Sequence, residues 1–401
     1  MAMMALKAVR ASACHPNAFR VSSRTGFSSL RFVTPRAVSS PARCTILPRT
    51  AKRHLQTQVF WLPPLMFVGL LGSLWIWKCM MMVVFQNKII YMPGLPPNAR
   101  RERIEDYARQ CGDISWQARR IRAADGTDLA VCMTDVACDG SKAGASSLAA
   151  GRGLATPVYI LYFQGNASSL PPRLQDLSWV LRALQRSSQP AHYTMVCLSY
   201  RGYWTSRGRP SEKGINLDAQ AALRFVGQIH AEAYGEDAPK PLIIFWGQSI
   251  GSGVATNLAA WEKCPSSLKP GALVLETPFT SIRAMLLALY PPKWVPYRYL
   301  WPFLRNHLDS MKNLEMIAAR RGDTTGEPYI ALVEGGRDEL VPAEHGAQLQ
   351  QRCVELGLLV EKKTVQGAFH NDVMFRAEGR KAVAEAIERA VVARAQVRKK
   401  A

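Results

Sequence analysis

Apolar and polar residues alternate along most of the chain in a way that predicts strands and helices in turn. From about residue 115, short runs rich in β-branched and aromatic residues are separated by stretches with helical periodicity. The predicted strands are 115–123, 128–135, 158–163, 193–198, 242–246, 272–275, 329–333 and 358–365. The predicted helices are 173–187, 217–233, 250–263, 344–356 and 378–397. Strands that alternate with helices predict an α/β fold with a mainly parallel sheet flanked by helices.

Two segments break this alternation. Residues 139–156 are rich in Gly, Ala and Ser, which predicts an exposed loop. Residues 279–314 are aromatic and apolar, and four prolines within them prevent one long helix. An apolar excursion between two strands predicts a small cap over a pocket. The alternative is that these aromatic residues belong to the ordinary core.

A long apolar segment precedes the alternating series. Residues 59–77 carry no charge, and the apolar character resumes after Lys78 as far as Phe85. About twenty apolar residues span a bilayer core. A buried helix of a soluble protein would be amphipathic instead, and this segment is not. We therefore expect a single transmembrane helix over 59–85, with the lipid bilayer as its partner, and a catalytic domain over 86–401.

The first 58 residues are basic. They hold ten Lys and Arg and no Asp or Glu, and they are rich in Ser and Ala. This composition is typical of a mitochondrial transit peptide, and the alternative is a disordered basic tail. It predicts a mitochondrial membrane, with the endoplasmic reticulum or another endomembrane as the alternative. The excess of cations before the apolar segment favours that side as the inside, so the catalytic domain would face the intermembrane space or a lumen.

The charge and the cysteines exclude other classes of function. The net charge of +21 falls to +11 over the 343 residues after residue 58, and no basic run is interleaved with aromatic residues. This distribution argues against a nucleic-acid partner. Nine scattered cysteines with no Cys-X-X-Cys pair predict neither a disulfide framework nor a metal site. We expect no cofactor.

A Gly-X-Ser-X-Gly motif is the first candidate for chemistry. The apolar run 242–246 leads directly into Gly247-Gln-Ser-Ile-Gly251, and a stretch compatible with a helix follows. In a strand-to-helix turn of this kind, small residues let the helix pass close to the strand and lift the serine above the sheet. Ser249 is therefore the candidate nucleophile, at a helix N-terminus that favours a developing oxyanion.

A serine nucleophile needs a base and an acid further along the chain. His370 follows the predicted strand that ends at residue 365, and Asp338 follows the strand 329–333. Both lie in strand-end loops, and the order Ser249, Asp338, His370 is the order expected of a triad on this fold. Glu339 is the alternative acid and His345 the alternative base. Ile250 supplies one amide of the predicted oxyanion hole.

The second amide is expected from the loop after the strand 158–163. The amide of Asn166 is the candidate there, with that of Ala167 as the alternative. Three polar residues elsewhere are assigned to structure: Arg201 and Glu212 to tying a loop together, and Asp218 to capping the start of a helix.

A string of short motifs in one order resembles the membrane-anchored bud-emergence-type α/β hydrolases, which are also serine-aminopeptidase-like. The motifs are Phe85-Gln-Asn-Lys-Ile-Ile-Tyr-Met-Pro-Gly94, Gln164-Gly-Asn166, Tyr200-Arg-Gly-Tyr203, Gly247-Gln-Ser-Ile-Gly251, Thr277-Pro-Phe-Thr-Ser281 and Asp338-Glu-Leu-Val-Pro342. The resemblance covers about residues 85–390. It implies the α/β-hydrolase fold, with Ser249, Asp338 and His370 matching the family triad. The chain departs from the family at Gln164, where the family usually has His, and at Ser199 and Trp204.

The function expected from these features is that of a membrane-anchored serine hydrolase. It would cleave carboxylic esters or thioesters of lipid-like acyl substrates through an acyl-serine intermediate. A serine peptidase of the aminopeptidase or prolyl type on the same triad is the alternative. A membrane scaffold without activity is a third hypothesis, and the intact Ser, Asp and His argue against it.

Overall fold

A computed structural model describes residues 49–138, 156–235, 239–320 and 327–400 of the chain. By its internal contacts the chain forms two units, Met1–Lys78 and Cys79–Ala401. The expected exposed loop 139–156 lies outside the described residues, except that Thr156 begins a strand. Most of the expected targeting segment also lies outside them.

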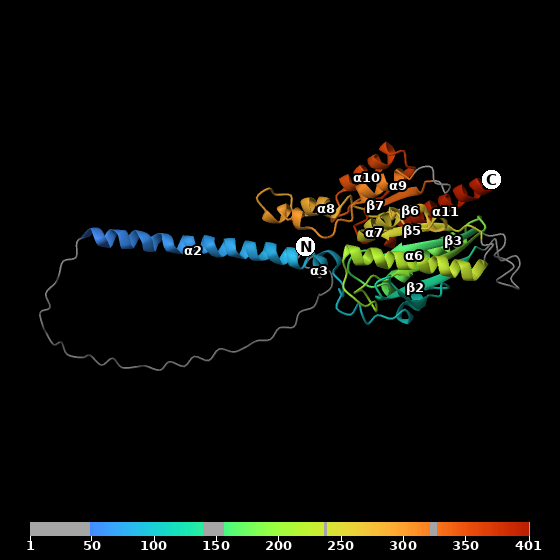
Figure 1. Ribbon diagram of the computed structural model, residues 1–401, viewed down its shortest axis with the longest axis horizontal. Coiled ribbons are helices and arrows are strands. Elements are labelled where there is room, and N and C mark those ends of the chain that lie inside the picture. The colour runs from blue at the N-terminus through green and yellow to red at the C-terminus, as the bar shows by residue number, and fades with distance from the viewer. Residues whose placement is uncertain (1–48, 139–155, 236–238, 321–326, 401) are drawn as a thin grey trace, which may run out of the picture. The chain divides into compact units, whose positions relative to one another are not determined.

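One sheet organises the second unit (Figure 1), in the strand order β1-β2-β4-β3-β5-β6-β7-β8. The strands are β1 (Gln117–Arg122), β2 (Asp128–Ala137), β3 (Thr156–Phe163), β4 (Ala191–Leu198), β5 (Leu242–Gln248), β6 (Pro270–Glu276), β7 (Tyr329–Gly335) and β8 (Val360–Val365). β2 pairs antiparallel with β1 and β4, and all later pairs are parallel. The expected α/β fold with a mainly parallel sheet is therefore confirmed. The central strands are continuous apolar runs because helices cover both of their faces.

Helices lie on both faces of the sheet. They are α4 (Ala108–Cys111), α5 (Leu174–Gln185), α6 (Glu212–Tyr234), α7 (Ile250–Ala259), α8 (Ile282–Leu289), α9 (Ser310–Ala318), α10 (Ala343–Glu355) and α11 (Ala377–Lys400). One apolar cluster joins the sheet to α6, α7 and α9, and a second cluster joins its other face to α5 and α11. Figure 1 shows α6 lying across the near face.

The start of α6 differs from the prediction. The helix begins at Glu212, five residues before the predicted start, because the hydroxyl of Ser211 accepts a hydrogen bond from the amide of Gly214 and caps it. Asp218 therefore lies inside the helix, and the prediction that it caps the start was wrong.

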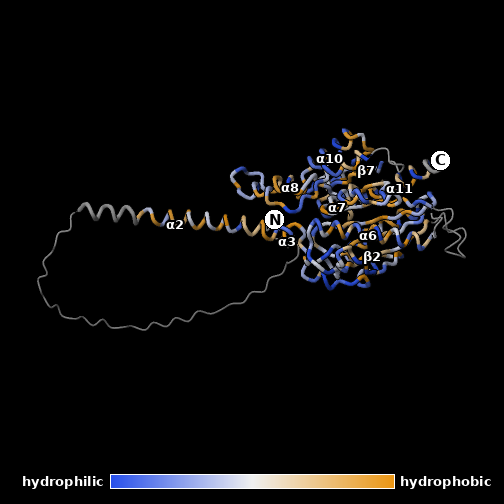
Figure 2. The backbone as a smooth tube through the Cα atoms, in the orientation of Figure 1, coloured by the Kyte–Doolittle hydropathy of each residue, from blue (hydrophilic) through white to orange (hydrophobic). Residues whose placement is uncertain are grey.

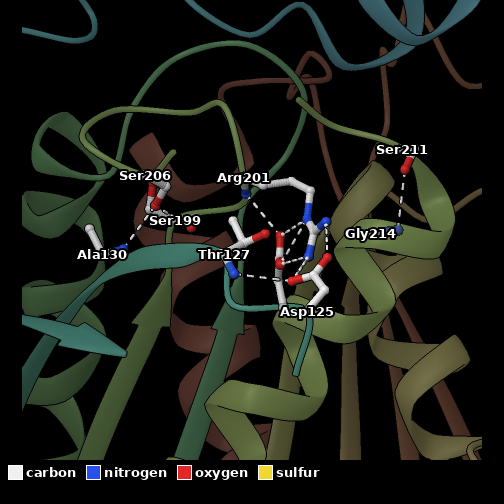
Figure 3. A network of polar contacts seen from close by, with 9 residues as sticks. Asp125, Thr127, Ala130, Ser199, Arg201, Ser206, Ser211 and Gly214 are labelled. Atoms are coloured by element: carbon white, nitrogen blue, oxygen red, sulfur yellow. Dashed lines mark hydrogen bonds and ion pairs between the residues drawn. The ribbon is translucent and has the colours of Figure 1, made fainter. Parts of the chain in front are cut away.

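Arg201 pairs with this inward carboxylate. Its guanidinium lies 2.6 Å from Asp218, and its backbone N–H also donates to Asp218. The guanidinium also pairs with Asp125 at 2.8 Å (Figure 3). The hydrogen bond from Arg201 lowers the pKa of Asp125 to about 2. Arg201 thus ties the β4–α6 loop to α6 and to the β1–β2 turn. Glu212 ties a different loop, since its carboxylate accepts from the backbone amide of Leu308 at the far end of the predicted cap.

The aromatic segment 279–314, called the cap segment below, contains α8, the short turns η6 (Pro296–Tyr299) and η7 (Trp301–Phe303), and the start of α9. Its prolines break it into short pieces, as expected. Tyr297 is buried, but four other aromatic side chains are exposed, which does not fit the alternative of ordinary core: Trp294, Tyr299, Trp301 and Phe303.

The apolar segment near the start forms one helix, α2 (Arg49–Val84). Within it, Phe60–Val84 is long and apolar enough to cross a membrane, and its residues are not buried within the protein. Figure 2 shows hydrophobic residues along much of this helix. The expected span 59–85 is one residue longer at each end. A short helix, α3 (Gln86–Tyr91), follows immediately.

Candidate active site

Ser249 stands in the turn between β5 and α7. Its backbone has φ 53° and ψ −115°, a conformation that a non-glycine residue rarely adopts. A Cβ atom on Gly251 would collide with the backbone carbonyl of Phe163, and one on Gly247 would collide with that of Gly251. Glycines at both positions therefore let α7 pack against β3 and β5 and hold the serine in its strained turn.

The register of the parallel strands brings four loops together at one edge of the sheet. Phe163 of β3 is opposite Gly247 of β5, so the loop that follows β3 runs beside Ser249. Gly335 of β7 is opposite Val365 of β8, so the loops that follow these two strands also meet. This edge is the one at which open α/β sheets bind their ligands.

The three residues predicted as a triad form a line of hydrogen bonds. His370 Nε2 lies 3.0 Å from Ser249 Oγ, and His370 Nδ1 lies 2.8 Å from Asp338 Oδ2. When the proton is on Nδ1, the imidazole donates to the carboxylate and its Nε2 accepts from the serine hydroxyl. Ser249 is 8% exposed and His370 2%, so the line is nearly closed to water.

The carboxylate of Asp338 is itself held in place. Its Oδ1 accepts from the backbone amides of Leu340 at 2.9 Å and Val341 at 2.8 Å, which leaves Oδ2 for the imidazole. The alternative acid, Glu339, accepts from the backbone amide of His370 at 3.1 Å and does not contact the ring. It therefore fixes the loop that carries the histidine.

The alternative base lies away from the serine. His345 is in α10, and its Nδ1 lies 2.9 Å from the hydroxyl of Thr280. Burial lowers its pKa. Its contacts join α10 to the start of the cap segment, and they give it a structural role.

The amides of the predicted oxyanion hole differ in availability. Ile250 is the first residue of α7, so its amide has no acceptor within the helix. The amide of Ala167 donates to the carbonyl of Tyr91 at 3.0 Å, which removes the alternative donor. Asn166 stays the candidate for the second amide. The loop that holds it is strained, because Ala167 and Ser168 both have positive φ, at 57° and 64°.

The segment just after the apolar helix holds the loop that contains Asn166 and Ala167. The sequence did not predict this contact. Tyr91 is fully buried, and its carbonyl accepts from both Ala167 and the hydroxyl of Tyr203. The carbonyl of Leu95 accepts from the amide of Ser168. The hydroxyl of Tyr91 donates to Asn306 in the cap segment at 3.1 Å. The loop beside Ser249 is thus held from outside the sheet.

Gln164, which replaces the usual histidine of the resembling family, is 2% exposed. Its side-chain nitrogen and oxygen have no hydrogen-bond partner among the described residues, while its backbone carbonyl accepts from the hydroxyl of Tyr200 at 2.9 Å. The loop is therefore fixed through its backbone and not through the Gln164 side chain.

A buried carboxyl lies under the serine. Glu276 ends β6 and is fully buried, and its backbone carbonyl accepts from the amide of Ser249 at 2.8 Å. Its carboxyl accepts from Gln248 at 3.1 Å and from Trp246 at 3.3 Å. Burial raises its pKa to about 7. The sequence signal for this residue was a lone acid at the end of an apolar strand, which sequence reasoning passed over.

No cluster of three His, Cys, Asp or Glu suited to a metal ion occurs in the part of the chain that the structure describes.

The chain is similar in sequence to known lipases. It is 40% identical over 193 residues to the lysophosphatidylserine lipase ABHD12 of Danio rerio, a match covering 47% of this chain and 46% of that protein. It is 31% identical over 214 residues to an uncharacterised protein of Mycobacterium tuberculosis, covering 53% of this chain and 63% of that protein. The matches thus cover 46% of the length of the first relative and 63% of the length of the second. No family model matches it.

Solved structures agree on the fold. An α/β hydrolase from Vibrio vulnificus superposes with a TM-score of 0.51 at 20% identity, over 77% of this chain and 92% of that one. Together with the sheet order and the strand-end loops, this likeness shows the α/β-hydrolase fold.

Proposed function

Taking as the premise that the chain is an α/β hydrolase related to lipases, we propose that it is a membrane-anchored serine hydrolase of lipid-like acyl esters or thioesters. The observation that carries the proposal is the line of hydrogen bonds from Ser249 through His370 to Asp338, at the ligand-binding edge of the sheet. A strained serine, a base and a fixed carboxylate in this geometry suit acyl transfer.

The proposed reaction has two halves. Ser249 Oγ attacks the acyl carbonyl while its proton moves to His370 Nε2, and Asp338 stabilises the imidazolium. The amides of Ile250 and Asn166 hold the negative oxygen. His370 then protonates the leaving alcohol or thiol as its bond to the acyl carbon breaks. A water, deprotonated by His370, releases the acid from the acyl-serine and restores the serine hydroxyl.

The relatives favour a lipid substrate. Those of known activity are named lysophosphatidylserine lipases, so we propose a lysophospholipid-like ester with a single acyl chain. The apolar helix Phe60–Val84, as a single-pass membrane anchor, would keep the enzyme where such a lipid resides. We propose neither a nucleic-acid partner nor a cofactor.

A peptidase is less well supported. An aminopeptidase must hold the free ammonium of its substrate, for which a carboxylate is the natural partner. Residues 277–308 carry Arg283, Lys293, Arg298 and Arg305 and no Asp or Glu, and Asp309 of the cap segment is used as the N-cap of α9. Such a segment would repel an ammonium group and would suit an anionic headgroup.

Ser249→Ala tests the proposal. We expect it to abolish labelling of the full chain by a fluorophosphonate probe and to reduce hydrolysis of a lysophospholipid by about 10⁴-fold or more. Labelling that survives in the variant would exclude Ser249 as the nucleophile. Labelling of the native chain without hydrolysis of any ester or thioester would instead leave the peptidase as the better hypothesis, and no labelling of the native chain would favour the scaffold.

For the location, we propose a mitochondrial membrane, with the endoplasmic reticulum or another endomembrane as the alternative. The support is the acid-free basic composition of residues 1–58. A fluorescent protein fused behind these residues should be imported into mitochondria. Its retention in the cytosol would contradict the proposal.

A further inference from the structure

The cap segment is hydrogen-bonded to the end of the apolar helix and displays aromatic and basic side chains. We propose that it binds the surface of an anionic phospholipid bilayer, as a second membrane contact of the hydrolase unit. The proposal concerns the unit Cys79–Ala401 and rests on the contacts, exposure and charge of its own residues.

The first observation is the continuity of the cap segment with the helix end. The guanidinium of Arg305 donates to the backbone carbonyls of Val83 at 3.0 Å and Val84 at 3.1 Å. The side chain of Gln86 donates to the carbonyl of Phe303 at 3.0 Å and accepts from the amide of Arg305 at 2.7 Å. The cap segment is therefore fixed at the residues where the candidate span ends.

The second observation is the exposure of its aromatic residues. Trp294 is 72% exposed, Phe303 60%, Tyr299 55% and Trp301 40%. Trp and Tyr are enriched at membrane interfaces because their rings are apolar at one end and polar at the other. Phe85 and Leu95, which flank α3, are also exposed and extend the apolar surface toward the helix end.

The third observation is the sign of the charge. Four cations and no acid lie between Thr277 and Leu308, and Lys88 and Arg100 are the charged residues of 85–100. The guanidinium of Arg283 stacks 3.9 Å from the ring centre of Trp301, which leaves the cation and the aromatic ring on one patch. A patch that is both aromatic and basic suits an anionic lipid surface. It is less suited to a protein partner, whose surface would have to match both properties.

This contact has a consequence for substrate supply. Leu308 of the cap segment lies against Gly253 in α7, the helix that begins directly after Ser249, so attachment of the segment to the lipid surface would bring this part of the hydrolase unit toward its substrate. Anionic headgroups would then raise the local concentration of an anionic lysolipid.

The test compares the full chain in nanodiscs of phosphatidylcholine with and without phosphatidylserine. Amide hydrogen exchange is measured over residues 291–303, with residues 354–359 as the reference. We expect amide exchange over 291–303 to be slower by about fivefold or more in the anionic discs, because one cation near an anionic surface strengthens binding by about that factor. Exchange over 354–359 should be the same in both discs. Equal exchange in both discs would overturn the proposal. So would slowing that appears only after another protein is added.

A pair of variants separates docking from folding. Lys293→Glu with Trp294→Ser should abolish the slowing by phosphatidylserine. The matched control, Leu359→Ser with Lys363→Glu, changes an exposed aliphatic residue just before β8 and an exposed lysine within it, and should retain the slowing. Both variants should give the circular dichroism spectrum of the native chain. Slowing retained in the first variant would overturn the proposal, and the native comparison decides it even if a variant misfolds.

Discussion

The carboxyl of Glu276 is fully buried, and the backbone carbonyl of the same residue accepts from the amide of Ser249. Burial favours the neutral form of this carboxyl, which is why its pKa rises to about 7. In the unfolded chain the same group ionises near its usual value of 4.5. The unfolded state therefore loses its proton first as the pH rises, and the free energy of unfolding falls between these two values.

Glu276→Gln should remove this pH dependence. A rise in pKa from 4.5 to about 7 corresponds to about 3 kcal/mol of unfolding free energy. The native chain has this stabilisation in full below about pH 4.5 and loses it as the pH rises through about 7. The variant should be more stable than the native chain at about pH 8 and closer to it at about pH 5. Thermal unfolding at both values measures this.

The substitution is compatible with the surrounding hydrogen bonds. In the native chain the hydroxyl of Tyr162 lies 3.4 Å from the side-chain oxygen of Gln248, and the nitrogen of Gln248 donates to Glu276. After the substitution, Gln248 can turn its side-chain amide by about 180°. Its oxygen then accepts from the new amide at position 276, and its nitrogen donates to the hydroxyl of Tyr162. An equal gain in stability at both pH values would contradict the titration of Glu276.

The two neighbouring acids of the β7–α10 loop make different predictions. Asp338→Asn should lower kcat by about 10⁴-fold, because an amide at this position no longer favours the productive tautomer of His370. Glu339→Gln keeps an oxygen that can accept from the amide of His370, so its kcat should fall by less than about tenfold. Steady-state kinetics on a lysophospholipid compares them. A larger loss in Glu339→Gln would reverse the two roles.

For single residues, the sequence predicts a place in the site only where a local motif fixes the position of the residue. Ser249, Asp338 and His370 each follow a recognisable strand, and the structure brings them within hydrogen-bond distance. Glu276 and Tyr91 were missed because their importance comes from burial and from contacts with residues distant in the chain. The exclusion of Ala167 as an oxyanion donor depends on such a contact, since its amide is taken by Tyr91.

At the scale of elements, the junction of β5 and α7 leaves no room for a side chain at Gly251. Gly251→Ala must push α7 away from β3, because the new Cβ atom would meet the backbone carbonyl of Phe163. A displacement of about 1 Å at the nucleophile lowers the rate by about 10²-fold. We expect this loss in kcat, measured on a soluble ester.

Gly227→Ala is the matched control. Gly227 also lies inside a helix, α6, but its new Cβ would meet only the mobile end of the Leu268 side chain, at 3.0 Å. Its kcat should be unchanged. An unchanged kcat in Gly251→Ala would show that the turn tolerates a shift of α7.

The elements themselves were predicted more securely than their ends. Each predicted strand forms, the central ones as buried apolar runs and the edge strands β1 and β8 with mostly polar residues. Helix starts were less certain, since one capping side chain decides them. Because Ser211 caps α6, the helix starts more than one turn before the predicted position. Asp218 is therefore not a helix cap but a buried ion-pair partner of Arg201.

At the scale of the whole molecule, hydropathy along the chain predicted an apolar helical span, and the helix that contains it, α2, begins ten residues before the predicted 59–85, at Arg49. It could not predict that the residues after this helix would be part of the hydrolase unit. Gln86, Asn87 and Tyr91 all contact Asn306, a residue more than two hundred positions later. A pattern in neighbouring residues cannot predict a contact between residues so far apart in the sequence.

These contacts mean that proteolytic release of the hydrolase unit from the proposed membrane anchor would be sensitive to the site of cleavage. A form beginning at Phe85, just after the candidate span, retains the carbonyls of Tyr91 and Leu95 that hold Ala167 and Ser168. A form beginning at Pro96 lacks both. It should lose about 10²-fold in kcat on a soluble ester, the loss expected when an oxyanion donor is misplaced, while circular dichroism shows a folded sheet. Equal activity of the two forms would contradict this.

A protease that cuts just after the proposed membrane anchor would therefore release a hydrolase that keeps its activity. One that cuts about eleven residues further on would release a folded molecule with only about one hundredth of it.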